Sequence, residues 1–381
     1  MKLPIYLDYN STTPVDHRVL EAMLPYFTEK FGNAASKTHS FGWIAEAAVE
    51  KAREHAAKLI HATAHEIIFT SGATEAINFA IKGVFENHSS KGNHIITVST
   101  EHKAVLDTCK YLETKGAQVT YLPVDREGLI NLDQLRESIT DKTILVCVMV
   151  ANNETGVIQP INEISKIVHE KGSIFMSDAT QAVGKINVDV ESDGIDLLCL
   201  SAHKFYGPKG IGVLYVRRKN PRVSLPPLIH GGGHERGLRS GTLNVPAIVG
   251  LGKACELAEK EMWNDAQRIS ALRTLLEQHF LGLKNVFVNG SIKNRLPNVT
   301  NLFFQNVKAD SLIAKLPEVA VSAGSACSSE IPEPSYVLKA MGIPDEMAYS
   351  SIRFSLGKFT TKEEIDFVCG KMKEKIKELR R

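Results

Sequence analysis

One lysine of this sequence follows an apolar segment and precedes a turn, a position from which its amine could react with a carbonyl group. Lys204 comes after the apolar run 195–200, and Gly207, Pro208 and Gly210 predict a turn before a second strand at 212–216. A strand edge would hold the amine in a crevice, where it could form a Schiff base. A lysine in this position can equally be a solvated surface residue. The neighbouring residues distinguish a reactive lysine from a surface lysine.

A carboxylate precedes this lysine by the length of one α/β connection. Asp178 ends a predicted strand at 173–177, and Gln181 follows it three residues later. Asp178 can be a simple helix cap, but both strand ends can also line one crevice. Pyridoxal phosphate needs an amine for its aldehyde and an anion that keeps its ring nitrogen protonated, so that the ring withdraws electrons. Lys204 and Asp178 fit those two requirements.

A small-residue turn supplies a candidate phosphate site. Ser71-Gly72-Ala73-Thr74 links the apolar segment 67–70 to a predicted helix, so free N–H groups and a hydroxyl would meet at the helix start. Such a turn is also a common helix cap. His102 follows the predicted strand 94–99 and could stack on a ring or move protons, although a histidine at a strand end is often structural.

The order of predicted elements indicates an α/β fold with a large, mostly parallel sheet covered by helices. Strands are expected at 66–70, 94–99, 118–124, 143–150, 173–177 and 197–201, and helices at 75–85, 103–115 and 161–171.

The pattern changes near residue 259, and we expect a smaller α+β domain from there. A charge-rich amphipathic segment at 259–280 precedes short strands around 286–289, 300–304 and 350–356 and a helix from Thr361. A chain of 381 residues is too long for one average domain. We therefore predict a large domain at 16–258 and a small domain formed by 1–15 and 259–381.

Short motifs along nearly the whole chain carry a family resemblance. They lie at 6–9, 12–16, 70–75, 100–107, 152–154, 177–181, 201–204, 230–237, 239–242, 324–327 and 351–357. In their residues and order, the chain resembles pyridoxal-phosphate-dependent cysteine desulfurases of the aminotransferase class V group, closest to the IscS type. The resemblance implies a pyridoxal-phosphate-dependent transferase of fold type I, and it implies that residues 1–15 pack with the small domain.

The resemblance also implies a role for each matching residue. Lys204 would form the Schiff base, Asp178 would pair with the ring nitrogen, His102 would stack on the ring, and Gln181 would bond the ring's phenolic oxygen. The other cofactor contacts would come from Ala73, Thr74, Asn153, Ser201, His203 and, from a partner subunit, Thr242. Asn153 and Arg353 would orient the substrate, since an arginine fork suits a carboxylate, although Arg353 can also be a surface ion-pair residue.

Cysteine usage separates this chemistry from that of related enzymes. Cys147 and Cys199 lie in apolar runs and are predicted core residues, whereas Cys327 lies in the small-residue run 322–329, which predicts an exposed loop. The resemblance implies that Cys327 takes sulfur from L-cysteine as a persulfide and leaves L-alanine. The sulfur would pass to an iron–sulfur scaffold or another acceptor protein, for cluster assembly and for thiolation of tRNA or cofactors.

Two other functions remain open at this stage. A selenocysteine lyase or another class V aminotransferase would keep Lys204 and Asp178 but would not need the thiol of Cys327. A binding or scaffold protein would keep the fold without the reaction and would bind no coloured cofactor.

Composition narrows the remaining possibilities. A formal net charge of +2 gives no concentrated basic footprint for nucleic acid, and no apolar run is long enough to span a bilayer. Unpaired cysteines favour a reducing compartment, so we expect a cytoplasmic protein. The resemblance, through the role of Thr242 in a partner's site, implies a homodimer. His230 and His234 lack a second ligand pair, and no metal site is expected apart from contact of Cys327 with an iron–sulfur or persulfide acceptor. The sequence ends at Arg381, short of the C-terminal extension that IscS-type proteins use for docking, which leaves the acceptor open.

Overall fold

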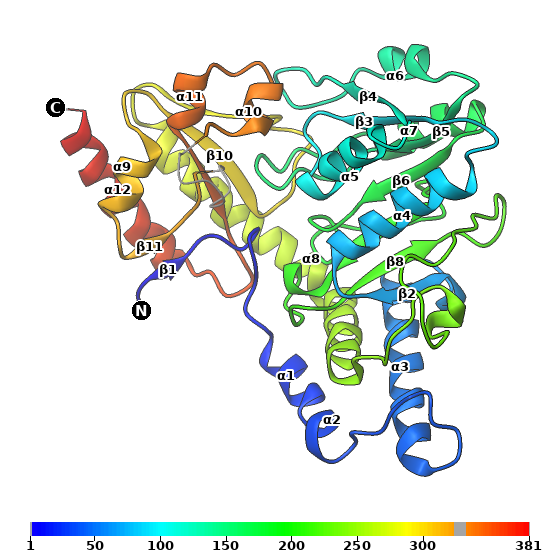
Figure 1. Cartoon of the computed structure of the whole chain (residues 1–381). Helices are drawn as coiled ribbons and strands as arrows, with labels where there is room; N and C mark the ends of the chain where they lie inside the picture. Colours follow the sequence, from blue (N-terminus) through cyan, green and yellow to red (C-terminus); the bar gives the residue numbers. More distant parts are fainter. Residues whose placement is uncertain (1, 324–332, 381) are drawn as a thin grey trace.

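Apolar strands that alternate with amphipathic helices build the larger part of the molecule around a seven-stranded sheet. The computed structural model describes residues 2–323 and 333–380. The sheet has the strand order β2-β8-β7-β6-β5-β3-β4 (Figure 1). Its strands are β2 (Ile67–Thr70), β3 (His94–Val98), β4 (Gln118–Leu122), β5 (Thr143–Cys147), β6 (Ile174–Asp178), β7 (Leu197–Ser201) and β8 (Gly212–Val216).

Strand direction brings one end of several strands to a common edge. β3, β4, β5, β6 and β7 pair in parallel, while β8 runs antiparallel to both β7 and β2. β2 therefore points the same way as β7. The carboxyl ends of β2, β3, β5, β6 and β7 meet at the same edge, which is where ligands bind in open α/β sheets.

Helices cover both faces of this sheet, because most of its strands are apolar on both sides. One core cluster packs α3 (Ser40–Leu59), α7 (Ile161–Glu170) and the first half of α8 (Val245–Leu281) on one face. A second packs α4 (Ala73–Asn87) and α5 (Lys103–Glu113) on the other. α1 (His17–Met23) and α2 (Pro25–Thr28) contact α8, and α6 (Leu132–Ser138) contacts α7.

A smaller group of elements surrounds a separate core. It contains the antiparallel sheet β12-β10-β9 and the parallel pair β1-β11. Its elements are β1 (Ile5–Tyr6), β9 (Val286–Val288), β10 (Val299–Phe304), α9 (Ala309–Ala314), β11 (Val319–Ala320), β12 (Ser351–Ser355) and α12 (Lys362–Leu379). The nearby helices α10 (Tyr336–Ala340) and α11 (Asp345–Tyr349) form a small apolar cluster of their own. Ile5 and Leu7 of the N-terminal segment lie in this core.

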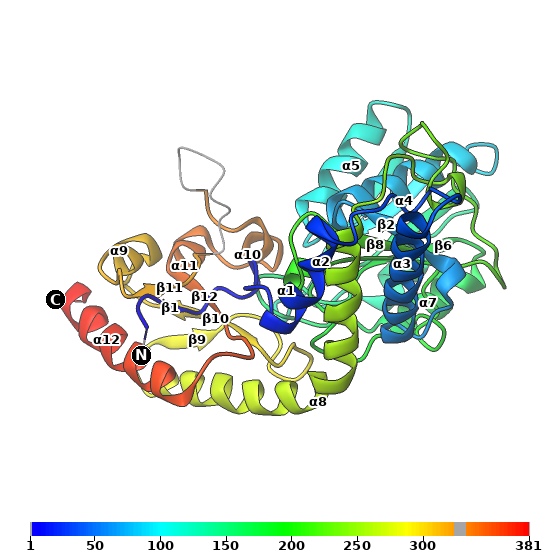
Figure 2. The same ribbon diagram turned by 90° about the horizontal axis from the view of Figure 1, so that it is seen from below.

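Helix α8 connects the two groups as one continuous, curved helix (Figure 2). It begins at Val245, well before the predicted start at Glu259. Two glycines lower the helix propensity there, but they allow close packing: a Cβ on Gly252 would lie 2.5 Å from Cα of Ala52 in α3. The proposed domain boundary at 258/259 falls inside this helix and stays a prediction.

The predicted α/β architecture is confirmed, and the predicted strands and helices agree with the structure closely. The strand predicted at 143–150 is shorter, since β5 ends at Cys147, and the helix predicted from Thr361 has that residue as its N-cap. Across residues 2–323 and 333–380, no helix is both long and apolar enough to cross a membrane.

Candidate active site

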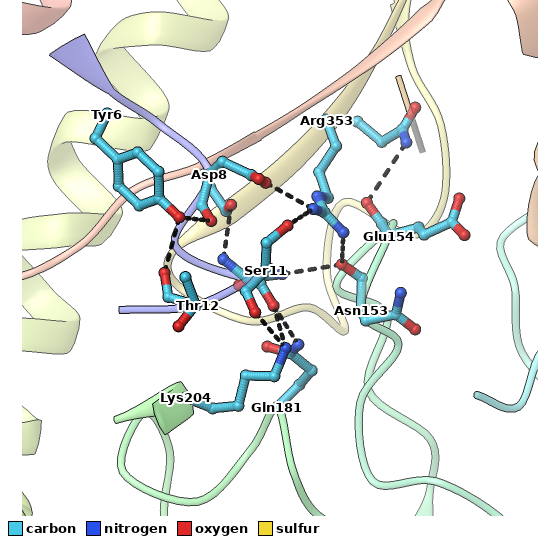
Figure 3. A network of polar contacts seen from close by, with 12 residues as sticks. Tyr6, Asp8, Ser11, Thr12, Asn153, Glu154, Gln181, Lys204 and Arg353 are labelled. Atoms are coloured by element: carbon cyan, nitrogen blue, oxygen red, sulfur yellow. Dashed lines mark hydrogen bonds and ion pairs between the residues drawn. The ribbon is translucent and has the colours of Figure 1, made fainter. Parts of the chain in front are cut away.

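The lysine singled out by the sequence lies in the short helical turn that follows β7 at the common sheet edge. The amine of Lys204 donates to the main-chain carbonyls of Asn10 at 2.7 Å and Ser11 at 2.8 Å. Figure 3 shows the side chains of Lys204 and Gln181 converging on this N-terminal segment, with Arg353 on its other side. The segment is held by Thr13, whose N–H and hydroxyl both donate to the carbonyl of His203, at 2.9 and 3.0 Å.

Burial changes the acidity of this amine. Burial, followed by repulsion from Arg353, lowers the pKa of Lys204 to about 8, against the opposing attraction of Asp178 and Asp8. At pH 7 roughly a tenth of such an amine is unprotonated, against about one part in 3,000 for an ordinary lysine. A much larger fraction of Lys204 is therefore in the unprotonated form that attacks a carbonyl carbon.

The predicted carboxylate and amide come from the end of β6. Asp178 is buried, and its Oδ1 accepts from the N–H of Thr180 at 2.9 Å. The amide Nε2 of Gln181 donates to the carbonyl of Asn10 at 2.9 Å. Lys204 and Gln181 thus bond to the same oxygen atom.

The small-residue turn after β2 forms a cradle next to the end of β7. Gly72 caps α4 with a φ of +154°, which favours glycine. A Cβ built on it would lie 3.7 Å from the hydroxyl of Ser201, and one on Gly212 would lie 2.7 Å from Cα of Gly72. Ala73 and Thr74 begin α4, so their N–H groups have no partner inside the helix. These groups and the serine hydroxyl can bind a phosphate.

Two histidines border the site. His102 is exposed and caps α5, where its Nδ1 accepts from the N–H of Ala104 at 3.1 Å. An accepting Nδ1 carries no proton, which leaves Nε2 as the outward donor. His203 makes a 3.1 Å hydrogen bond between Nδ1 and the hydroxyl of Thr12. Burial, and then the charges of Lys204, Lys209 and Lys185, lower the pKa of His203 to about 4, so that its ring is neutral near pH 7.

Arg353 on β12 approaches the site from the small sheet. Its Nη2 donates to Asp8 Oδ1 at 2.6 Å and to Ser11 Oγ at 2.8 Å, and its Nη1 donates to the carbonyl of Asn153 at 3.1 Å (Figure 3). Arg353 is buried, which rules out the alternative of a surface ion pair. Its Nε and Oδ1 of Asn153 are buried polar atoms without a hydrogen-bond partner. Such atoms call for a ligand.

Thr242 is one predicted residue that is not brought together with this group. Thr242 is exposed in the segment that leads into α8, and the nearby Arg239 pairs with Glu75 of α4 at 2.9 Å. Cys327 lies outside the described residues. Cys147 and Cys199 are buried, as predicted, and Cys109, Cys255 and Cys369 are buried too. The described part of the chain contains no cluster of three or more histidine, cysteine or acidic residues that could hold a metal.

Asn10 is a central residue of the site that the sequence did not indicate. Its carbonyl accepts from Lys204 and Gln181, its Nδ2 donates to the carbonyl of Asn153 at 3.0 Å, and its N–H donates to Ser355 at 2.9 Å. Its position within the polar run 8–13 was the only available signal. Asn10 therefore connects the small sheet to the lysine.

Comparison with known proteins identifies the family. The family model for aminotransferase class V matches residues 5–368. The chain belongs to this family. Among the relatives of this class V chain, the cysteine desulfurase IscS of Anaeromyxobacter sp. (strain Fw109-5) is 56% identical over all of this chain and 94% of its own length. The cysteine desulfurase IscS of Rickettsia massiliae is 54% identical over all of this chain and 93% of its own length.

Solved structures agree with the family assignment. A NifS-like protein superposes with a TM-score of 0.92 at 41% identity, covering 98% of this chain and 100% of that chain. SspA, solved in complex with cysteine, superposes with a TM-score of 0.82 at 39% identity, covering 94% of this chain and 100% of that chain. The fold-type expectation is thereby confirmed.

Class V enzymes of this kind use pyridoxal phosphate, and the residues here fit that cofactor. Lys204 offers an amine of lowered pKa, Asp178 a buried carboxylate, and the turn at 71–74 a glycine cradle with free N–H groups. The buried hydroxyl of Thr180 also lacks a partner beside Asp178. These groups match the aldehyde, the ring nitrogen and the phosphate of the cofactor.

The lowered pKa of Lys204 predicts how cofactor loading depends on pH. Only the unprotonated amine reacts with an aldehyde, so the loading rate of cofactor-free protein should rise about tenfold per pH unit below pH 8 and flatten above it. Absorbance after mixing with pyridoxal phosphate measures the rate. Replacement of the exposed Lys209 by methionine should leave the profile unchanged. A rate that keeps rising to pH 10 would contradict the role of burial.

Proposed function

We propose that this chain is a cysteine desulfurase that converts L-cysteine to L-alanine and transfers the sulfur to Cys327. The observation that carries the proposal is the meeting of Lys204 and Arg353 at the same N-terminal segment: one offers a reactive amine and the other a fork for a carboxylate. An amino acid presents both an amino group and a carboxylate. The names of the full-length relatives favour cysteine as that amino acid.

The residues of the chain divide the work of binding and proton transfer. Pyridoxal phosphate, when bound, supplies a ring that withdraws electrons from the bonds of the substrate. Lys204 holds the cofactor and, once displaced by the substrate amine, can carry a proton, since its pKa is about 8. Asp178 keeps the ring nitrogen protonated. Arg353 and Asn153 orient the substrate, with the guanidinium of Arg353 binding its carboxylate.

The sulfur transfer balances without another reactant. The thiolate of Cys327 attacks the substrate sulfur, an S–S bond forms, and the bond between that sulfur and Cβ breaks. The electron pair of the broken bond stays with Cβ, which takes a proton and becomes the methyl group of alanine. We assign Cys327 from its motif in the sequence, and His102 as the group that stacks on the cofactor ring, because its Nδ1 accepts from the N–H of Ala104 and its Nε2 already carries the ring proton.

The proposal includes a homodimer with composite sites. Thr242 is exposed and free to reach a partner's phosphate site. Exposed apolar side chains around α1, α2 and the start of α3 support association, with exposed fractions of 59% for Phe27, 64% for Phe31 and 55% for Trp43. We further propose a cytoplasmic location and delivery of the sulfur to an iron–sulfur scaffold or another acceptor protein.

Mass spectrometry after brief exposure to L-cysteine tests the proposal, with alanine quantified in the same sample. The Cys327 peptide should gain one sulfur, about 32 Da, with a matching amount of alanine, and Cys327→Ser should lose both signals. The peptides of Cys109 and Cys369 are internal controls, because burial raises the pKa of both thiols to about 12 and makes them unreactive.

The other outcomes separate the competing functions. Alanine without added sulfur on Cys327, or a Cys327→Ser variant that behaves like the parent, would favour a selenocysteine lyase or another class V aminotransferase. Protein that binds no coloured cofactor would contradict all of these enzymatic functions.

A further inference from the structure

Lys185 is a half-buried lysine that the mechanism above does not use. Its Nζ donates to Oε1 of Gln181 at 2.6 Å and to Oδ1 of Asn10 at 3.2 Å. The charged groups that act on it are Lys204 and Arg353, which are cationic like Lys185 itself. Lys185 thus faces two amide oxygens rather than a carboxylate partner.

The turn after β6 fixes this lysine beside the active-site lysine. Gln181 and Lys185 are four residues apart, and the N–H groups of Val183 and Ile186 donate back to Ala179 and Ala182, so both side chains lie on one face of a helical turn. Gly184 has a φ of +77°, and a Cβ on it would lie 2.6 Å from Cβ of Phe205. The turn therefore packs against the residue that follows Lys204.

An amine in this place is costly to the fold. Burial, followed by repulsion from Lys204 and Arg353, lowers the pKa of Lys185 well below the ordinary lysine value. An apolar side chain would fill the same space without that cost. We therefore look for the role of Lys185 in the side-chain amides of Gln181 and Asn10, to which it donates hydrogen bonds.

The lysine determines which way the Gln181 amide faces. A side-chain amide has an accepting oxygen at one end and a donating nitrogen at the other, and Nζ of Lys185 donates to the oxygen. Lys185 thus selects the orientation with Oε1 toward itself. Nε2 then faces the carbonyl of Asn10, the oxygen to which the Lys204 amine also donates, at 2.7 Å.

We propose that Lys185 is a positioning residue that holds the Gln181 amide with its N–H toward Lys204, so that a donor faces the ring oxygen of the cofactor. The inference rests on the pyridoxal phosphate site of the proposed function and goes beyond it. With the amide reversed, Oε1 would face the anionic ring oxygen and repel it.

A double-mutant cycle in the cofactor-loaded protein tests the inference. The readout is the pH midpoint at which the visible absorbance band of the bound cofactor changes. A donor to the ring oxygen stabilises the cofactor most when the nitrogen linked to Lys204 has lost its proton. Lys185→Met and Gln181→Ala should therefore each raise the midpoint by about one unit, and the double variant should raise it no further than the larger single effect.

Controls separate positioning from a simple loss of charge. Lys209→Met removes an exposed positive charge near the site and should keep the parental midpoint, and Lys185→Arg should restore it, since arginine keeps the donors. If Lys185→Met yields no folded protein, Lys185→Gln is carried through the same cycle and judged in the same way.

The cycle also has outcomes that overturn the inference. Additive shifts would show that the charge of Lys185 acts directly on the cofactor, and an unchanged midpoint in Lys185→Met would show a purely structural role. A parent protein that forms no cofactor band would overturn the proposed function itself, whereas additivity overturns this inference alone.

Discussion

Replacement of Lys204 by alanine is expected to lower kcat/KM for alanine release from L-cysteine by a factor of at least about 10³. The variant loses the amine that we assign to the cofactor, and the same amine is the proposed proton carrier. Borohydride reduction followed by mass spectrometry gives a second measurement. The parent should carry the cofactor on the Lys204 peptide, and the variant should not.

Lys209→Ala is the matched control for this experiment. It removes an exposed lysine five positions away and should keep parental activity and covalent labelling at Lys204. If Lys204→Ala retained the parental rate, or if reduction fixed the cofactor to another lysine, the central assignment of the site would be wrong.

Replacement of Glu235 by alanine is expected to lower the free energy of unfolding by about 3–5 kcal/mol. Glu235 and Arg53 form a buried bidentate pair, with both N···O distances at 2.8 Å. Glu235 also accepts from the N–H of Phe69 at 2.8 Å, and Arg53 donates to the carbonyl of Ile67 at 2.8 Å. Alanine would leave a buried guanidinium and a strand N–H without their acceptor.

Urea denaturation of the cofactor-free protein, followed by circular dichroism, measures this loss. The double variant Arg53→Met with Glu235→Leu removes both charges and should recover a large part of the lost stability, because no charge is then left unpaired. A single Glu235→Ala variant as stable as the parent would mean that water or another group replaces the carboxylate.

The pair also affects the site. Glu235 belongs to the segment that carries Thr242, and Phe69 belongs to the strand that leads into the turn at 71–74. Glu235→Ala should therefore weaken pyridoxal phosphate binding in protein that remains folded, which a fluorescence titration of the cofactor-free variant would measure.

Apolar runs and turn residues in the sequence predicted the residues of the site that lie at the ends of strands. Lys204 and Asp178 follow apolar strands, and the turn at 71–74 precedes a helix, so apolar runs and glycines were enough to place them at one sheet edge. The parallel pairing of β6 and β7 then brings Asp178 and Lys204 to the same edge.

Contacts between distant segments were not predictable in this way. Asn10 contacts Lys204 across 194 positions and does so through its main-chain carbonyl, which any residue type possesses. The sequence did not distinguish Lys185 from other lysines, because its contacts with Gln181 and Asn10 exist only in the folded structure. The first part of α8 was missed because its glycines serve packing against α3 and lower the local helix propensity.

The continuous course of α8 has a mechanical consequence. With 37 residues the helix is about 55 Å long, and its buried positions stop at Leu257 and resume at Ile269, between the two cores. A rotation of the small sheet against the large one would have to bend this stretch against its own hydrogen bonds, and it would also pull the N-terminal segment away from Lys204. We therefore expect the helix and the N-terminal segment, which contacts both Lys204 and Arg353, to resist a change in the separation of these two residues.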